Sequence, residues 1–170
     1  MESAHLELIE QAIGALKVRD ILLYSARLAR PTPPPAHTGK FDATQLQKRS
    51  VKYVVGDGEI RESGTVKLLQ VYVNLEIKVT GLEAENPPVY FEIEAEFQVE
   101  YEMSFELSEA AIKAFADINS VHNVWPFWRQ HVFDAVARGR LPPLEVPLFT
   151  GVTRRKKQIS AQSDDSTAVN

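Results

Sequence analysis

The sequence predicts an α+β fold: a four-stranded antiparallel meander sheet packed by a long C-terminal helix, with an extra helix at the N-terminus. Three observations support this prediction. Strand-like patterns fill the chain from Val18 to Phe105, helical periodicity takes over after Ser108, and a separate amphipathic pattern occupies the first 17 residues.

The N-terminal pattern predicts a helix over residues 1–17, because apolar residues recur at helical spacing, namely Leu6, Ile9, Ile13 and Leu16. A β-rich stretch follows from Val18 to about Ala29. The run Pro31-Thr32-Pro33-Pro34-Pro35 ends it, because successive prolines cannot donate the hydrogen bonds of a sheet. We therefore expect a loop as far as about Thr44.

Three further strands follow the loop. The first is predicted by apolar residues at every second position, namely Val51, Tyr53 and Val55. Gly56-Asp57-Gly58 predicts a turn after them. The next alternating run extends from Val71 to Val79. The last extends from Phe91 to Phe105, with large apolar residues at every second position and mostly glutamates between them. This strand should have one buried face and one solvated, acidic face.

The helical part begins at Ser108, which predicts an N-cap for a helix from about Glu109 to Ile118. After Asn119-Ser120 we expect a second helix over His122–Arg138, ended by Gly139. Residues 141–149 must be extended, because their prolines forbid a regular helix. The chain thus divides into an N-terminal helix (1–17), a main domain (18–151) and a polar, flexible tail (152–170).

The second helix is more apolar than a one-sided helix needs to be. Its main stripe holds Val121, Val124, Trp125, Trp128, Val132, Ala135 and Val136, and Phe127 and Phe133 lie on its two flanks. Such a helix is usually buried on two sides, which favours contact with another subunit. The alternative is that the N-terminal helix or residues 141–149 cover these rings within one chain.

Composition bounds the function. The chain has 170 residues, no cysteine and a formal net charge of -4, so disulfides and thiolate metal sites are excluded, and the acidic total argues against nucleic acid as a partner. No apolar run predicts a membrane span, and no signal peptide opens the chain. We expect a soluble, cytoplasmic protein.

Motifs of catalysis and cofactor binding do not stand out. His5, His37, His122 and His131 do not pair at metal-ligand spacing, and the chain has no glycine-rich phosphate loop and no nucleophile elbow. The glutamate row predicts a solvated sheet face that discourages aggregation. The sequence therefore predicts no enzyme, no cofactor and no metal site.

The segment Asn123-Val124-Trp125-Pro126-Phe127-Trp128-Arg129, continuing to Arg138-Gly139-Arg140-Leu141-Pro142, resembles the SecB family of protein-export chaperones. In that family a helix starting with an aromatic-Pro-aromatic-Arg pattern leads to an Arg-Gly turn and an apolar loop with proline. Val18-Arg19-Asp20-Ile21 resembles the family's first strand and Phe91–Phe105 its fourth. The similarity extends from Leu16 to Phe149.

The resemblance implies a homotetramer, a dimer of dimers, that binds unfolded or export-bound polypeptides without ATP. Carried onto this chain, the family's client grooves would be lined by Phe41, Leu46, Val51, Tyr53, Val55, Leu141, Leu144, Val146, Leu148 and Phe149. The oligomer interface would involve Trp125, Phe127, Trp128 and Phe133. For Leu144, Val146, Leu148 and Phe149, a place in the core is an equally good interpretation.

The chain departs from the family at its end. Family members use a further helix and an acidic tail to contact the export motor SecA, whereas this chain has Arg154-Arg155-Lys156-Lys157 and then only Asp164 and Asp165. SecA as a partner is thus left open, and the chain resembles a divergent SecB-like chaperone, of which some serve a dedicated client such as an antitoxin. Two other hypotheses compete with this one: an adaptor that binds one folded partner, and a small-molecule-binding or enzymatic domain.

Overall fold

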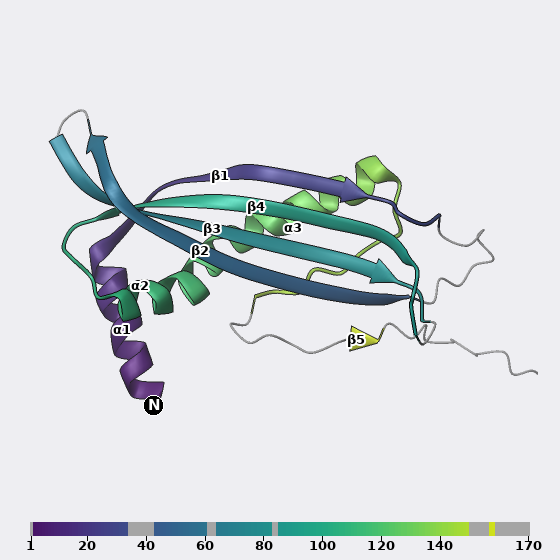
Figure 1. Cartoon of the computed structure of the whole chain (residues 1–170), viewed down its shortest axis with the longest axis horizontal. Helices are drawn as coiled ribbons and strands as arrows, with labels where there is room; N and C mark the ends of the chain where they lie inside the picture. Colours follow the sequence, from purple (N-terminus) through teal and green to yellow (C-terminus); the bar gives the residue numbers. More distant parts are fainter. Residues whose placement is uncertain (1, 34–42, 61–63, 83–84, 150–156, 159–170) are drawn as a thin grey trace, which may run out of the picture.

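The computed structural model describes residues 2–33, 43–60, 64–82, 85–149 and 157–158 of the chain (Figure 1). Its elements in chain order are α1 (Glu2–Ala15), β1 (Leu16–Ala29), β2 (Thr44–Ile60), β3 (Gly64–Thr80), β4 (Val89–Met103), α2 (Glu109–Phe115), the π-helical turn η1 (Ala116–Ser120), α3 (Val121–Gly139) and β5 (Lys157–Gln158). The predicted α+β fold, with its long C-terminal helix and its N-terminal helix, is confirmed.

The sheet is antiparallel throughout, but it is not a simple meander. The strand order is β1-β4-β3-β2-β5, so β2, β3 and β4 form a meander while β1 lies beside β4. The predicted four-strand meander is wrong in this respect. Consecutive strands pair through short hairpins, and the connection from Ala29 to Thr44, which begins with prolines, is too long for one.

The second strand is longer than its sequence pattern predicts. Gly56, Asp57 and Gly58 do not form a turn but pair with Leu68, Lys67 and Val66 of β3. A Cβ atom on Gly58 would collide with the Leu68 side chain, so this glycine permits close packing across the two strands. β2 ends at Ile60 and β3 begins at Gly64, and residues 61–63 lie outside the described part.

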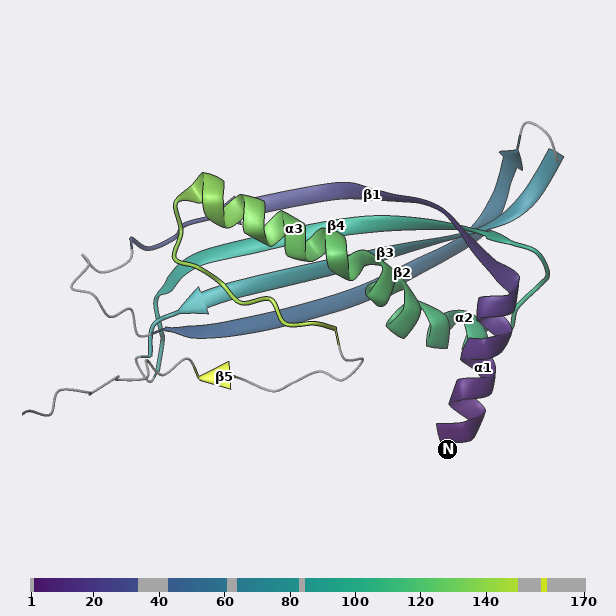
Figure 2. The same ribbon diagram turned by 180° about the vertical axis from the view of Figure 1, so that it is seen from behind.

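Within the described residues, α2, η1 and α3 lie on one face of the sheet and α1 lies at one end, and the other face, here called the outer face, has no helix over it (Figures 1 and 2). The alternation of β4 is confirmed, because Phe91, Ile93, Ala95, Phe97, Val99, Tyr101 and Met103 are buried and the residues between them are half-buried. α3 covers this surface with Val121, Val124, Trp128 and Val132. The core therefore lies between α3 and the helix-facing side of β3 and β4.

The two predicted C-terminal helices are one continuous element. Ser108 caps α2 as predicted, since its Oγ accepts from the Ala111 N–H at 3.2 Å. Asn119 and Ser120 do not separate two helices, because both lie in η1, which leads directly into α3. Buried Ser120 accepts a hydrogen bond from the Tyr101 hydroxyl at 3.0 Å, so its side chain needs no solvent.

The helix end also differs from the prediction. Gly139 is the last helical residue, and the left-handed position that follows is occupied by Arg140, with φ 48° and ψ 46°. A Cβ atom at Gly139 would lie 3.1 Å from side-chain atoms of Leu28 and Leu141. The glycine therefore allows α3 to approach β1 closely, while an arginine carries the backbone strain that glycine usually relieves.

The N-terminal helix packs against α2 at one end of the sheet (Figure 2). Ile9, Ala12 and Ala15 are buried there, whereas Leu6 and Ile13 stay exposed. In the part of the chain that the structure describes, no helix combines the length and the apolar character needed to cross a membrane.

Candidate functional site

Residues 141–149, here called the strap, run back along α3 as an extended segment (Figure 2). Two side chains hold its backbone: Gln45 Nε2 of β2 donates to the Glu145 carbonyl at 3.1 Å, and Trp125 Nε1 of α3 donates to the Pro147 carbonyl at 2.8 Å. The three prolines of the strap cannot donate backbone hydrogen bonds, so side-chain donors fix the segment in place.

An aromatic cluster anchors the far end of the strap. The Phe149 ring centroid lies 5.3 Å from that of Trp125 and 6.3 Å from that of His122. The Arg49 guanidinium carbon lies 5.3 Å from the Phe149 ring centroid, at the distance of a cation–π contact. Phe149 thus links the strap to β2 and α3 together.

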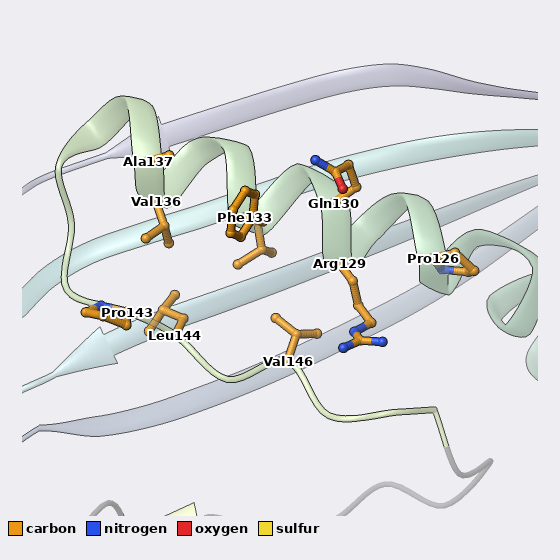
Figure 3. Close-up of a pocket in the computed structure, with 10 residues that line it drawn as sticks. Pro126, Arg129, Gln130, Phe133, Val136, Ala137, Pro143, Leu144 and Val146 are labelled. Atoms are coloured by element: carbon orange, nitrogen blue, oxygen red, sulfur yellow. The ribbon is translucent and has the colours of Figure 1, made fainter.

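A groove of about 640 Å³, here called the strap groove, separates the strap from the outward side of α3 (Figure 3). Its lining is mainly apolar and comprises Pro126, Arg129, Gln130, Val132, Phe133, Val136, Ala137, Pro143, Leu144 and Val146. Phe133 is 69% exposed, and the Gln130 amide donates to Asp134 Oδ1 at 3.0 Å. The groove offers apolar surface together with one guanidinium, that of Arg129.

The predicted client residues of the strap have different environments. Leu144 and Val146 are half-buried and line the strap groove, and Leu148 is 72% exposed. Phe149 is half-buried in the aromatic cluster, whereas Leu141 is buried in the core. The structure therefore brings only some of these residues to an accessible surface.

The predicted residues of β2 lie on both faces of the sheet. Val51, Tyr53 and Val55 pair opposite buried residues of β3, so they are on the helix-facing side, where Val55 is 43% exposed. Leu46 pairs opposite Lys78 and lies on the outer face, away from them. Phe41 lies outside the described residues.

The two edges of the sheet differ in their readiness to accept another strand. Beyond its pairing with β3, β2 pairs only with β5, at Thr44 and Gln45, so the edge from Leu46 to Gly58 has no strand partner within the described residues. The register shifts of β1, at Val18/Asp20 and at Leu23/Ser25, interrupt the other edge. An incoming strand would find regular backbone spacing along β2 but not along β1.

The aromatic residues of α3 fall into two groups. Trp128 is 1% exposed and is buried against the sheet of its own chain, and half-buried Trp125 is covered by the strap. Phe127 and Phe133 are 48% and 69% exposed. Cover within one chain thus accounts for the two tryptophans but not for the two phenylalanines.

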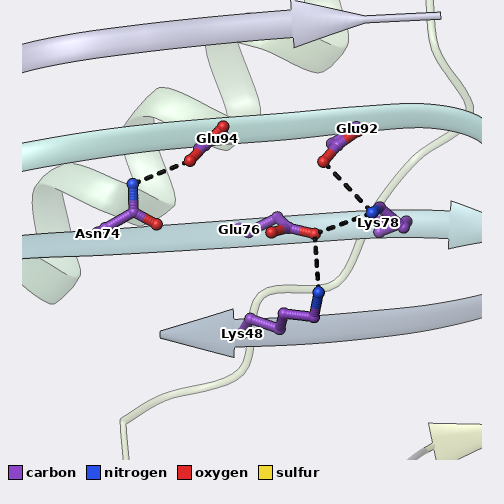
Figure 4. A network of polar contacts seen from close by, with 6 residues as sticks. All are labelled: Lys48, Asn74, Glu76, Lys78, Glu92 and Glu94. Carbon is purple, nitrogen blue, oxygen red and sulfur yellow. Dashed lines mark hydrogen bonds and ion pairs between the residues drawn. The ribbon is translucent and has the colours of Figure 1, made fainter. Parts of the chain in front are cut away.

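The outer face is not the acidic surface that the sequence predicts. Lys48 and Lys78 lie within 4 Å of Glu76, Lys78 also pairs with Glu92 at 3.4 Å, and Asn74 donates to Glu94 (Figure 4). Arg19 and Lys52 pair in the same way with Glu100 and Glu96. Cations on β1, β2 and β3 therefore offset the charges of these glutamates, Glu94 excepted, and sequence spacing does not reveal this pairing.

Among the described histidines, His131 packs near the core. Its ring stacks on the Trp128 ring, with 6.0 Å between the ring centroids. It also makes an edge-to-face contact with Phe97, with 6.5 Å between the centroids. Burial lowers the pKa of His131 below the ordinary histidine value. Among the described residues, no group of three or more His, Cys, Asp or Glu side chains is placed to hold a metal ion.

Three residues of this region were not predicted as site residues: Gln45 and Arg49, which hold the strap, and Arg129 in the groove. Arg129 had a usable signal, since it lies on α3 between Pro126 and Phe133 at helical spacing, on the side away from Trp128. No sequence pattern indicated Gln45 and Arg49, because their roles depend on a segment about one hundred residues away.

The described residues form an antiparallel sheet covered on one face by a long helix, with an extended strap returning along that helix, and this fold is SecB-like. The chain shows this fold in its similarity to the Mycobacterium tuberculosis SecB-like chaperone Rv1957, solved in complex with a ChAD peptide from the HigA1 antitoxin Rv1956. The TM-score is 0.60, the sequence identity is 16%, and the alignment covers 85% of this chain and 97% of that chain. No protein-family profile and no curated protein sequence matches the chain. The likeness is therefore one of fold.

Proposed function

We propose that this protein is an ATP-independent chaperone that binds extended segments of unfolded or partly folded polypeptides in the cytoplasm. The observation that carries the proposal is the open edge of β2 from Leu46 to Gly58, next to Val51, Tyr53 and Val55 on the helix-facing side. Every polypeptide offers backbone hydrogen-bonding groups and apolar side chains, so an open edge beside apolar surface can bind many sequences.

The arrangement of the strap supports this proposal. Leu144, Val146 and Phe149 add apolar surface near β2 and α3, and the strap is held through side chains rather than through a sheet. A segment that is fixed at few points can change its position for different clients at a small cost in free energy. We also propose client contact for Phe41 and for Leu46 on the outer face, and we assign Leu141 to the core rather than to client contact.

Two neighbouring valines provide a sharp test. Val55 is 43% exposed on the helix-facing side, and Val54 is 57% exposed on the outer face, so Val55→Asp and Val54→Asp make the same chemical change on opposite faces. We expect Val55→Asp to weaken client binding by about tenfold, since a carboxylate would be desolvated against an apolar client. Val54→Asp should stay within about twofold of the parent.

The measurement is the suppression of aggregation of a chemically denatured client at near-stoichiometric ratio, with the binding constant obtained by fluorescence anisotropy. Equal loss in both variants would contradict the assignment of the helix-facing side. Leu144→Ser and Phe149→Ser should likewise weaken binding while the mass in solution stays constant. If assembly is lost instead, these residues belong to the core.

A dedicated chaperone for one partner is the second candidate. It is favoured by the fold neighbour, whose structure was solved with an antitoxin peptide. No effect on several denatured clients, together with capture of a single partner, would select this function. A direct binding assay with SecA decides whether the protein acts in export.

For the assembly we propose a homotetramer, built as a dimer of dimers, in which Phe127 is covered by another subunit. Phe133 lines the strap groove, so we do not place it in this subunit contact. Trp125 and Trp128 contribute indirectly, by holding α3 and the strap in place. The support for this assembly is the 48% exposure of Phe127 in the single chain. Mass measurement by sedimentation equilibrium, repeated with Phe127→Ser, tests this assembly.

A further inference from the structure

The strap groove carries an inference about which polypeptides are bound. It lies on the outward side of α3, with Phe133, Val136 and Leu144 toward one end and Arg129 toward the other (Figure 3). Its volume of about 640 Å³ falls in the range of sites that enclose a ligand of drug size. The groove can thus take a few side chains of an extended segment rather than a whole domain.

Arg129 gives this groove a preference for charge. Among the described residues it forms no hydrogen bond and no ion pair, and the neighbouring amide of Gln130 is already bonded to Asp134. A purely apolar occupant would remove water from the guanidinium without supplying hydrogen-bond acceptors in its place, which costs free energy. An occupant with a carboxylate would instead form a charge-assisted hydrogen bond. The groove therefore discriminates against uncharged apolar segments and favours acidic ones.

The spacing of the groove sets the spacing of the occupant's side chains. Arg129 and Phe133 are four residues apart on α3, which corresponds to about 6 Å along the helix axis. Two residues of an extended chain span about 7 Å and place their side chains on the same side. A large apolar side chain on Phe133 and a carboxylate on Arg129 then belong to residues i and i+2 of the bound segment, in either chain direction.

We propose that the strap groove binds an extended segment of a partner polypeptide in which a large apolar residue and an acidic residue are two positions apart, with the carboxylate on Arg129. This proposal rests on the proposed function, because it names the class of polypeptide that the chaperone prefers.

Matched peptides test the proposal on the full-length protein. Fluorescein-labelled peptides carry Leu-Ser-Glu, Leu-Ser-Gln or Leu-Ser-Lys in a glycine-serine background, and binding is measured by anisotropy to the parent, Arg129→Gln, Arg129→Glu and the control Arg138→Gln. We expect the parent to bind the Glu peptide about fivefold more tightly than the Gln peptide. Arg129→Gln should abolish this preference, Arg129→Glu should transfer it to the Lys peptide, and Arg138→Gln should keep it.

Each other result has a definite meaning. Equal binding of the Glu and Gln peptides by the parent overturns the inference, while continued suppression of client aggregation keeps the proposed function. Binding of no peptide, with aggregation still suppressed, also overturns the inference. Loss of both activities removes the proposed function itself. A change of mass in solution for Arg129→Gln, without a change in peptide preference, means that a second copy of the chain occupies the groove and overturns the proposal.

Discussion

Removing the hydroxyl of Tyr101 should destabilise the protein out of proportion to the size of the change. The Tyr101 ring is fully buried, and its hydroxyl donates to Ser120 Oγ at 3.0 Å while it accepts from Asn123 Nδ2 at 3.0 Å. Tyr101→Phe breaks both hydrogen bonds and leaves the buried Ser120 hydroxyl without this partner. With about 1 kcal/mol for each bond and a further cost for an unsatisfied buried group, we expect a loss of about 2–3 kcal/mol.

The comparison with Ser120→Ala sharpens this estimate. Ser120→Ala removes the acceptor but leaves Tyr101 bonded to Asn123, so it should cost only about 1 kcal/mol. Because the two residues share one bond, the double variant should lose less stability than the two single variants added together, by about 1 kcal/mol. Urea unfolding followed by circular dichroism gives these values, and Tyr24→Phe, on a 58% exposed residue, is the control.

Two results would refute this reasoning. One is a Tyr101→Phe variant whose free energy of unfolding lies within about 0.5 kcal/mol of the parent value. This would mean that the hydroxyl contributes no more to stability than a surface group does. The other is strict additivity in the double variant, which would mean that Tyr101 and Ser120 do not interact. The same network fixes η1 to β4, so its loss should also broaden the thermal transition.

Three further predictions follow from single contacts. Burial lowers the pKa of His131, so the stability that its neutral form provides is present above about pH 6.5 and is lost as the pH falls through the lowered value; His131→Gln should lose less stability than the parent between pH 7 and pH 5, and parallel curves would contradict this. Arg140→Gly should stabilise the chain by about 0.5–1 kcal/mol because it relieves the left-handed backbone, whereas Gly139→Ala should destabilise it through contact with Leu28 and Leu141, both measured by urea unfolding. Trp125→Phe keeps an aromatic ring but loses the bond to Pro147, so amide exchange at Glu145, Val146 and Phe149 should accelerate by about fivefold, and unchanged exchange would show that the bond does not hold the strap.

Local periodicity predicted the elements whose two faces differ strongly. β4 alternates over its whole length because one side faces α3 and the other faces solvent, and this contrast is visible in the sequence. β2 was predicted too short because Gly56 and Gly58 carry turn-forming signals, while the pairing with β3 that overrides them is non-local. The break predicted at Asn119-Ser120 failed for a related reason, since the Tyr101 hydroxyl that satisfies Ser120 lies on a different element.

The candidate site was predictable in residue type but not in orientation. The apolar residues of the strap were identified, yet only the structure separates buried Leu141 from exposed Leu148. Leu46 was grouped with Val51 although an odd separation along a strand places two residues on opposite faces. Helical spacing places Arg129 on the same side of α3 as Pro126 and Phe133, but no pattern in the sequence specifies that the strap passes beside it.

The position of β1 beside β4 imposes an order on the folding of this chain. Residues 30–88 separate the two strands, so β1 leaves the ribosome long before its partner exists, while β2 and β3 can pair as soon as both have been made. We expect the β2–β3 hairpin to form early and the β1–β4 pairing to complete the sheet late. Pulsed hydrogen exchange during refolding would show β3 amides protected before those of β1, and simultaneous protection would contradict this order. A protein that is proposed to bind the unfolded chains of others would then itself pass through a folding stage in which β1 is unpaired.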